Sequence, residues 1–210
     1  MSVILVGGFI ETIELAESIG LQIEGIIDKQ FNEVLNQRIK YLGDDSVILD
    51  PSFKNLYLNS SIFLTPDQPK IRKKLFDYYV NKGWTFENMI AKDCKIAKSA
   101  IILENVSTMI QSCVNISSNV KIGVCVRINT MANVMHDCSI GNFVTIAPNA
   151  VLLGAVVIED GAYIGANATI LPGLRVGKNA IIGAGSVVTK NVSANDIMVG
   201  IPARKLIKKK

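Results

Sequence analysis

The chain has 210 residues, of which 49% are hydrophobic and 19% charged, and its formal net charge is +4. This apolar and weakly charged composition excludes a disordered chain. The single histidine, His136, excludes functions that need a multi-histidine metal site. We therefore expect one or two globular domains with no metal, no nucleic-acid partner and no membrane span, since no apolar run reaches roughly 18 residues.

Cysteine usage and the start of the chain suggest where the protein works. None of the four cysteines forms a C-x-x-C pair, and no signal peptide precedes the first strand-like run at residues 3–6. We expect a reduced, cytoplasmic protein whose thiols are small buried packing groups. The thiols are those of Cys94, Cys113, Cys125 and Cys138.

Residues 1–93 are predicted to form a small Rossmann-like α/β domain. A short buried strand at 3–6 is followed by Gly7-Gly8 and by a helix over 10–19, which Gly20 ends. A second strand at 23–27 ends at Asp28. Glycine-rich turns before helices favour phosphate groups, and an acidic residue after the second strand can bind ribose hydroxyls. Gly7, Gly8 and Asp28 fit these roles, although close packing of strand against helix is the alternative.

The rest of this half continues the alternation of strands and helices. Residues 61–64 are predicted to form a strand, and a helix is predicted from Pro69 to about Lys82, with Gly83 at its end. The predicted apolar stripe of this helix consists of Ile71, Leu75, Tyr78 and Tyr79. Alternating strands and helices predict a parallel sheet.

Residues 94–210 have a different composition and contain a six-residue repeat. This half carries a net charge of +7, against −3 for residues 1–93, and only two of the 13 aromatic residues. Fourteen aliphatic residues follow one another at six-residue steps from Ile110 to Val188. A period of six excludes an α-helix and is typical of short strands joined by tight corners. It predicts a left-handed parallel β-helix, with Ile96 and Ile102 in its first coil and Gly, Asn or Asp at its corners.

His136 and Asp137 lie near one of these corners, two and three residues after the inward Val134. A histidine can move protons at neutral pH, and a neighbouring carboxylate can orient the ring and raise its basicity. The alternative is a structural histidine that is hydrogen-bonded at the corner.

Three segments resemble one protein family. They are Ile-Asn-Thr at 128–130, Val-Met-His-Asp-Cys-Ser-Ile-Gly-Asn-Phe at 134–143 and Val-Gly-Ile-Pro-Ala-Arg at 199–204. The sequence resembles the NeuD/PglD-like sugar O-/N-acyltransferases of the sialic acid and bacillosamine type. This resemblance implies a homotrimer with active sites between neighbouring β-helices. It also implies that His136 is the general base, that Asp137 raises its basicity and that Asn129 contacts the sugar.

The resemblance further implies that acetyl-CoA lies along the groove between subunits. The N–H of Gly154 would contact the thioester carbonyl, and the backbone at Ala166 and Ala184 would hold the pantetheine arm. Thr145 stands where the family has a histidine that contacts acetyl-CoA. Arg204, in the basic C-terminal tail, is a candidate for the phosphates of the coenzyme, with a solvated tail as the alternative. The N-terminal domain would hold the nucleotide.

Two segments depart from the family pattern. Many members carry Gly-Ala-Ser-Gly-His-Gly after the first strand, whereas residues 7–12 read Gly-Gly-Phe-Ile-Glu-Thr and lack the histidine. Where members carry Gly-x-Asn, this chain has Thr65-Pro66-Asp67. These departures leave His136 in place but affect the residues expected to bind the nucleotide and the sugar.

We therefore expect acetyl transfer from acetyl-CoA to the amine of a nucleotide-linked amino sugar, in bacterial surface glycan biosynthesis. Two alternatives remain open at this point. One is transfer to a sugar hydroxyl, as in the sialic-acid type, because the same base serves both acceptors. The other is a non-catalytic β-helix that acts as a binding or scaffold protein.

Overall fold

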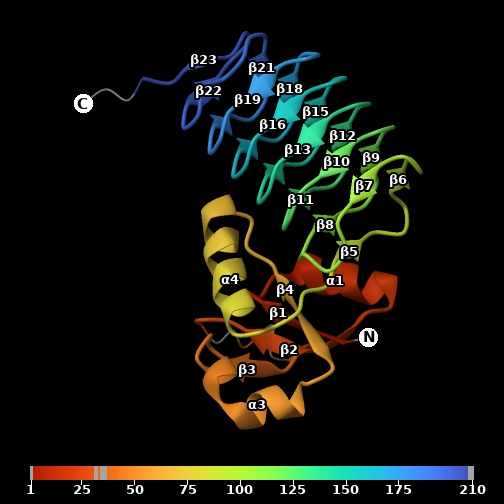
Figure 1. Cartoon of the computed structure of the whole chain (residues 1–210), viewed down its shortest axis with the longest axis vertical. Helices are drawn as coiled ribbons and strands as arrows, with labels where there is room; N and C mark the ends of the chain where they lie inside the picture. The colour runs from red at the N-terminus through yellow and green to blue at the C-terminus, as the bar shows by residue number, and fades with distance from the viewer. Residues whose placement is uncertain (1, 31–32, 34–36, 208–210) are drawn as a thin grey trace.

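The computed structural model describes residues 2–30, 33 and 37–207. A small α/β domain lies at one end of a stack of coils, and the chain leaves the stack at the opposite end (Figure 1). Within the described residues, no helix is long and apolar enough to cross a membrane.

The N-terminal domain is a four-stranded parallel sheet with the strand order β3-β2-β1-β4, which confirms the predicted α/β architecture. The predicted helix over 10–19 has those bounds, and Gly20 ends it with a left-handed φ of 80°. The strands are β1 (Ser2–Val6), β2 (Gln22–Ile27), β3 (Tyr41–Gly43) and β4 (Ser60–Leu64). The helices are α1 (Ile10–Ile19), the 3-10 helix η1 (Val47–Leu49), α3 (Pro51–Leu56) and α4 (Pro69–Asn81).

Helix α4 corrects one detail of the prediction. Its expected apolar stripe is wrong at Ile71, which is 44% exposed, whereas the neighbouring Arg72 is only 1% exposed. The buried face of the helix consists of Arg72, Leu75 and Tyr79, which lie three to four residues apart. A charged residue occupies the inward position because backbone carbonyl groups surround its guanidinium group.

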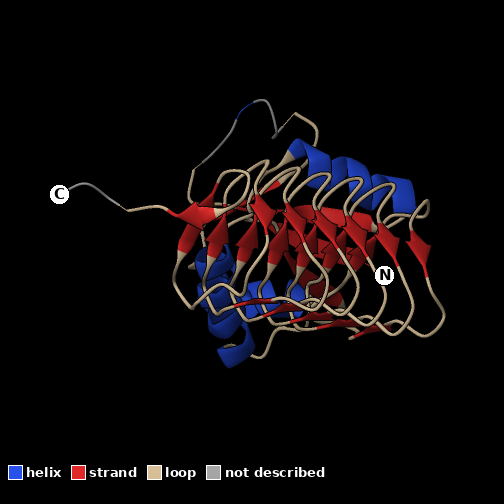
Figure 2. Cartoon of the chain, turned by 90° about the horizontal axis from the view of Figure 1, so that it is seen from above, coloured by secondary structure: helices blue, strands red, loops and turns tan. Residues whose placement is uncertain are grey.

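The second part of the chain is the predicted β-helix of short strands, which form three sheets and are parallel except for β23 (Figures 1 and 2). The eight-stranded sheet contains β5 (Met89–Ile90), β8 (Met109–Ile110), β11 (Arg127–Ile128), β14 (Thr145–Ile146), β17 (Tyr163–Ile164), β20 (Ile181–Ile182), β22 (Ile197–Val199) and β23 (Arg204–Lys205). The six-stranded sheet contains β6 (Lys95–Ile96), β9 (Asn115–Ile116), β12 (Asn133–Val134), β15 (Val151–Leu152), β18 (Thr169–Ile170) and β21 (Val187–Val188). The five-stranded sheet contains β7 (Ile101–Ile102), β10 (Lys121–Ile122), β13 (Ser139–Ile140), β16 (Val157–Ile158) and β19 (Arg175–Val176).

The aliphatic ladder fills the interior of this β-helix, as the six-residue period predicts. From Ile110 to Val188 the ladder residues are at most 3% exposed, and they form one hydrophobic cluster. The ladder already begins at β5, which pairs with β8. The division of the chain into domains 1–93 and 94–210 stays a prediction.

The corners also follow the six-residue period. A residue with positive φ recurs at six-residue steps from Cys113 to Gly185. The expectation of Gly, Asn or Asp is too narrow, because Met131 and Phe143 also adopt this conformation, with φ of 61° and 58°. Their N–H groups donate hydrogen bonds to carbonyl groups of the preceding coil, as Phe143 does to Val124 at 2.7 Å. These bonds offset the cost of about 1–2 kcal/mol for a non-glycine residue in this region.

The cysteines correct a second expectation. All four thiols are free, but only Cys125 and Cys138 are buried, while Cys94 is half-buried and Cys113 is exposed. Cys113 occupies a corner, with φ of 59°, where its side chain points outward and donates to a carboxylate oxygen of Asp93. The expectation of four buried packing thiols is therefore wrong for Cys113.

Candidate functional site

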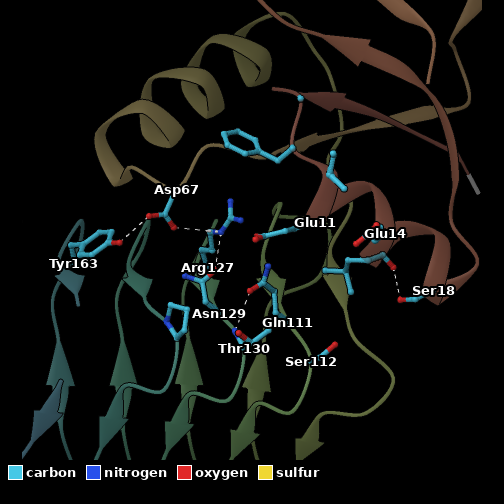
Figure 3. A pocket seen from close by; sticks show the side chains of 15 residues that line it. Glu11, Glu14, Ser18, Asp67, Gln111, Ser112, Arg127, Asn129, Thr130 and Tyr163 are labelled. Atoms are coloured by element: carbon cyan, nitrogen blue, oxygen red, sulfur yellow. Dashed lines mark hydrogen bonds and ion pairs between the residues drawn. The ribbon is translucent and has the colours of Figure 1, made fainter. Parts of the chain in front are cut away.

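A cavity of about 920 Å³ lies between helix α1 and the corner that follows the eight-stranded sheet (Figure 3). This volume is within the range of small-molecule sites. Its polar and charged lining comes from both domains. These lining residues are Glu11, Glu14, Ser18, Asp67, Gln111, Ser112, Arg127, Asn129, Thr130 and Tyr163.

A hydrogen-bonded cluster forms one end of the cavity. The Nε atom of Arg127 lies 3.5 Å from a carboxylate oxygen of Asp67 and donates to Oδ1 of Asn129 at 3.1 Å. Another guanidinium N–H of Arg127 donates to the carbonyl oxygen of Thr65. The Tyr163 hydroxyl donates to the other carboxylate oxygen of Asp67 at 3.0 Å. Burial lowers the pKa of Arg127, and the nearby Asp67 carboxylate opposes this shift.

The glycine turn after β1 lies against the acidic residue after β2, so the N–H of Gly8, which was expected to bind a phosphate, has a protein partner. The N–H of Gly8 donates to a carboxylate oxygen of Asp28 at 2.8 Å. Gly7 has a φ of 98°, and a Cβ atom there would lie 2.2 Å from the Thr65 hydroxyl, so this position requires glycine. Gly8 lines the cavity, which places the Gly8–Asp28 contact beside its wall.

His136 forms a second cluster with its neighbour. Its Nδ1 atom lies 2.8 Å from a carboxylate oxygen of Asp137, whose other oxygen accepts a hydrogen bond from the Asn119 amide at 3.0 Å. The hydrogen bond with His136, and then that with Asn119, lowers the pKa of Asp137. Asp137 is a corner residue with φ of 61°. The carboxylate is thus held against Nδ1 while the imidazole side chain stays 60% exposed.

Within one chain, His136 does not face the cavity. The cavity residues Asn129 and Thr130 follow β11 of the eight-stranded sheet, whereas His136 follows β12 of the six-stranded sheet. These are different corners of the β-helix, and His136 is not among the residues that line the cavity. The structure therefore brings Asn129 together with Arg127 and Asp67, but it does not bring them to His136.

Gly154 lies directly beside the histidine ring. A Cβ atom on Gly154 would be 2.5 Å from Cε1 and 2.6 Å from Nε2 of His136. The N–H of Gly154 donates no hydrogen bond within the described part of the chain. A residue whose N–H has no partner in the described part of the chain thus lies next to an exposed imidazole ring.

The other residues expected to bind the coenzyme differ in accessibility. Ala166 is half-buried and Ala184 exposed, and they lie on neighbouring coils, since the N–H of Gly185 donates to the carbonyl of Ala166. Arg204 is exposed in β23, at the end of the β-helix farthest from the N-terminal domain (Figure 1). Thr145 is fully buried, and its hydroxyl donates to the carbonyl oxygen of Asp67 at 2.7 Å.

Replacement of Gly154 by alanine is expected to disable the histidine without unfolding the protein. The added methyl group would push the imidazole away, and the exposed ring can rotate at little cost to stability. If His136 is the general base that the family resemblance implies, kcat should fall by at least about 10-fold, because such a base must stay within hydrogen-bond reach of the proton. Steady-state rates and thermal unfolding of Gly154→Ala measure the two effects.

Gly173→Ala is the matched control for this variant. It lies on the next coil, and nothing lies within 4 Å of the added methyl group, although its φ of 70° carries a strain of about 1 kcal/mol. Normal turnover by Gly154→Ala would show that the space beside His136 is not used.

Sequence reasoning missed Arg127, Asp67, Tyr163 and Glu11 as lining residues. The sequence does contain a signal for two of them, because residues 18 positions apart lie one coil apart and stack on the same face of the β-helix. The outward residues immediately before the ladder in β11, β14 and β17 are Arg127, Thr145 and Tyr163, which form one stacked row. From the sequence alone, an arginine in this row predicts only an outward side chain. It marks a cavity wall because the N-terminal domain covers this row, which the repeat does not predict.

The family comparison matches the repeat region. The family model described as Bacterial transferase hexapeptide (six repeats) matches residues 155–190. This match agrees with the coils seen there and confirms the predicted β-helix of hexapeptide repeats. Among the described residues, no group of three or more His, Cys, Asp or Glu side chains could hold a metal ion.

Solved structures match both parts of the chain. PerB from Caulobacter crescentus, in complex with CoA and GDP-perosamine, has a TM-score of 0.87 and 25% identity, over 98% of this chain and 97% of that one. WeeI from Acinetobacter baumannii AYE has a TM-score of 0.85 and 29% identity, over 98% of this chain and 100% of that one. The acetyltransferase domain of PglB from Neisseria gonorrhoeae, in complex with acetyl coenzyme A, has a TM-score of 0.86 and 23% identity, over 98% of both chains. The predicted two-part fold and the resemblance to NeuD/PglD-like sugar acyltransferases are confirmed.

Proposed function

We propose that the protein is an acetyl-CoA-dependent N-acetyltransferase that acts on the amino group of a nucleotide-linked amino sugar. The observation that carries this proposal is the exposed His136–Asp137 pair beside the unpaired N–H of Gly154. This pair lies on a fold shared along almost the whole chain with PerB, whose structure holds CoA and GDP-perosamine. We propose that the protein works in the cytoplasm, where acetyl-CoA is made, and that it serves bacterial surface glycan biosynthesis.

The proposed chemistry is direct acyl transfer. The hydrogen bond from Nδ1–H of His136 to Asp137 leaves Nε2 with a free electron pair. The acceptor amine attacks the thioester carbonyl carbon while Nε2 removes a proton from the amine nitrogen. The N–H of Gly154 stabilises the negative charge that develops on the carbonyl oxygen. The carbon–sulfur bond then breaks, and the coenzyme leaves as a thiol with the proton from the imidazolium.

A homotrimer would complete the site. Because His136 and the cavity occupy different corners of one β-helix, the acceptor in the cavity can reach a histidine only if a neighbouring subunit supplies it. Threefold packing of β-helices places such corners against one another and leaves a groove for acetyl-CoA. We propose that Ala166, Ala184 and Arg204 line this groove. Thr145 would not line the groove, because it is buried and its hydroxyl donates to the carbonyl oxygen of Asp67.

Mixed trimers test this assembly. We expect His136→Ala and Asn129→Leu to be inactive as separate proteins. Co-expression should restore a fraction of the activity, because some interfaces then pair an intact His136 with an intact Asn129 of the neighbour. Failure of mixed trimers to regain activity would argue that each subunit supplies both residues to its own site.

Replacement of Asp137 by asparagine is expected to lower kcat by about two- to five-fold. Asparagine keeps a hydrogen bond to the ring but removes the charge that stabilises the imidazolium, and the interaction of such an exposed pair is weak because water screens it. Steady-state kinetics with saturating acetyl-CoA measure the change. The control is Lys74→Ala on the exposed surface of α4, which should leave kcat unchanged.

A thermal-shift panel tests the proposed ligands. Coenzyme A at 100 times its Kd should add about 2.7 kcal/mol and raise Tm by about 5 °C or more. Nucleotide-linked amino sugars should give a further shift when coenzyme A is present. No shift with any coenzyme A concentration would favour the alternative of a scaffold protein without catalytic activity.

A further inference from the structure

The Arg127–Asp67 pair has features that its contribution to folding does not explain. The side chain of Arg127 is 7% exposed and that of Asp67 42% exposed, and both line the cavity. Taking the guanidinium group of Arg127 out of water costs several kcal/mol, and an ion pair at 3.5 Å with the half-buried Asp67 offsets only part of this cost. A pair of this kind at the wall of a cavity is better explained by what it binds.

Asp67 is held in place from several sides. Three stacked outward residues of the eight-stranded sheet all contact it. Arg127 and Tyr163 contact its carboxylate, and Thr145 donates to its backbone carbonyl. The buried Arg72 donates to the same carbonyl at 2.6 Å. The carboxylate therefore has a fixed position at the cavity wall, as recognition by hydrogen bonds requires.

The pair keeps hydrogen-bonding capacity that the protein does not use. Within the described residues, Nε and Nη1 of Arg127 have partners, whereas Nη2 has none. Each carboxylate oxygen of Asp67 has one contact and can accept another hydrogen bond. A hydrogen-bond donor of Arg127 and an acceptor of Asp67 thus lie side by side at the cavity wall.

The local charge favours a neutral group over a phosphate. The guanidinium of Arg127 lies between the carboxylates of Asp67 and Glu11 (Figure 3). Its positive charge is already balanced, so a phosphate there would meet two carboxylates. A sugar hydroxyl group avoids this repulsion, because it can accept from Nη2 or donate to Asp67.

We propose that Arg127 and Asp67 form a two-point recognition site for neighbouring hydroxyl groups on the acceptor sugar. One hydroxyl accepts a hydrogen bond from Nη2 of Arg127, and the next donates to the carboxylate of Asp67. These two residues would therefore determine which sugar the enzyme accepts. This inference rests on the proposed function, since it assigns the cavity to the sugar.

The test combines protein variants with altered acceptors. Wild-type turnover is measured first with GDP-perosamine and with dTDP-4-amino-4,6-dideoxyglucose, and the better acceptor is then compared with its analogues that lack one ring hydroxyl. For the parent acceptor, Arg127→Met and Asp67→Asn should each raise KM by about 10- to 100-fold, the effect of a hydrogen bond to a charged group. For the analogue that lacks the matching hydroxyl, the same variants should change KM less than three-fold. The KM for acetyl-CoA should not change.

The possible outcomes separate this inference from the proposed function. Equal losses with the parent acceptor and with every deoxy analogue would overturn the inference, because a structural defect does not depend on one hydroxyl. If a single variant folds poorly because one charge is left unpaired, the double variant Arg127→Met/Asp67→Asn is measured instead. It removes both charges and should show the same dependence on the hydroxyl groups. Absence of wild-type turnover with all amino sugars and acetyl-CoA would instead count against the proposed function itself.

Discussion

Replacing His136 by alanine is expected to lower kcat by about 10²- to 10⁴-fold, the range for loss of a positioned general base. Without the imidazole, the neighbouring carboxylate of Asp137 is a poor substitute base, because its pKa is ordinarily far below that of imidazole and the hydrogen bond from Asn119 lowers it further. Stability should change by less than about 0.5 kcal/mol, since the side chain is exposed and fills no cavity. Single-turnover rates with saturating acetyl-CoA measure the chemical step directly.

The Lys74→Ala variant is also the control for this experiment, because Lys74 is exposed on α4 and remote from His136. His136→Asn tests whether the loss is chemical, since asparagine keeps polarity and approximate size without a titratable nitrogen. It should be as inactive as alanine. Near-normal turnover of either His136 variant with the true acceptor would show that the proposed mechanism is wrong.

Replacing Arg72 by methionine is expected to lower the free energy of unfolding by about 3–5 kcal/mol. The guanidinium donates to five backbone carbonyl groups, which lie both in the loop after β4 and at two corners of the β-helix. Methionine fills a similar volume but leaves these buried acceptors without partners. Urea unfolding, followed by intrinsic fluorescence and by circular dichroism, measures the loss.

The same change should also loosen the contact between the two parts of the chain. The carbonyls of Cys125, Phe143 and Val144 belong to the β-helix, whereas those of Pro66 and Asp67 belong to the N-terminal part. Arg72→Lys should recover only part of the stability, because an ammonium group cannot reproduce the planar set of donors. Lys74→Met on the same helix is the matched control. A loss below about 1 kcal/mol for Arg72→Met would show that water or a local shift satisfies these carbonyls.

The β-helix could be predicted almost completely because one local rule repeats along it. Each inward aliphatic residue and each corner recurs at the same spacing, so an ambiguous residue at one position does not change the prediction made from the whole repeat. Less of the N-terminal domain could be predicted, because no single rule repeats along it. Its main elements were predictable from glycine, proline and short apolar runs, but the orientation of α4 was not. The burial of Arg72 depends on carbonyls from Cys125 and Val144, more than 50 residues away, and no local pattern encodes that contact.

The candidate site divides in the same way. The repeat placed His136 and Asp137 near a corner, whereas the roles expected for them and for Gly154 came from the family resemblance. The structure places Gly154 beside the His136 ring, one coil further along. Arg127 and Asp67 could not be predicted as a pair, because they come from different parts of the chain and meet only where the domains pack together. The relation between His136 and the cavity depends on subunit packing, which lies beyond the pattern of a single chain.

Product analysis tests acetyl transfer to a sugar amine most directly. Purified protein is incubated with acetyl-CoA labelled in the acetyl group and with a nucleotide-linked amino sugar such as GDP-perosamine. The product is then isolated and treated with hydroxylamine, which cleaves esters readily and leaves amides intact. We predict a labelled product that resists this treatment and is not formed by His136→Ala. A labelled product that hydroxylamine cleaves would identify a hydroxyl acceptor and contradict the proposal.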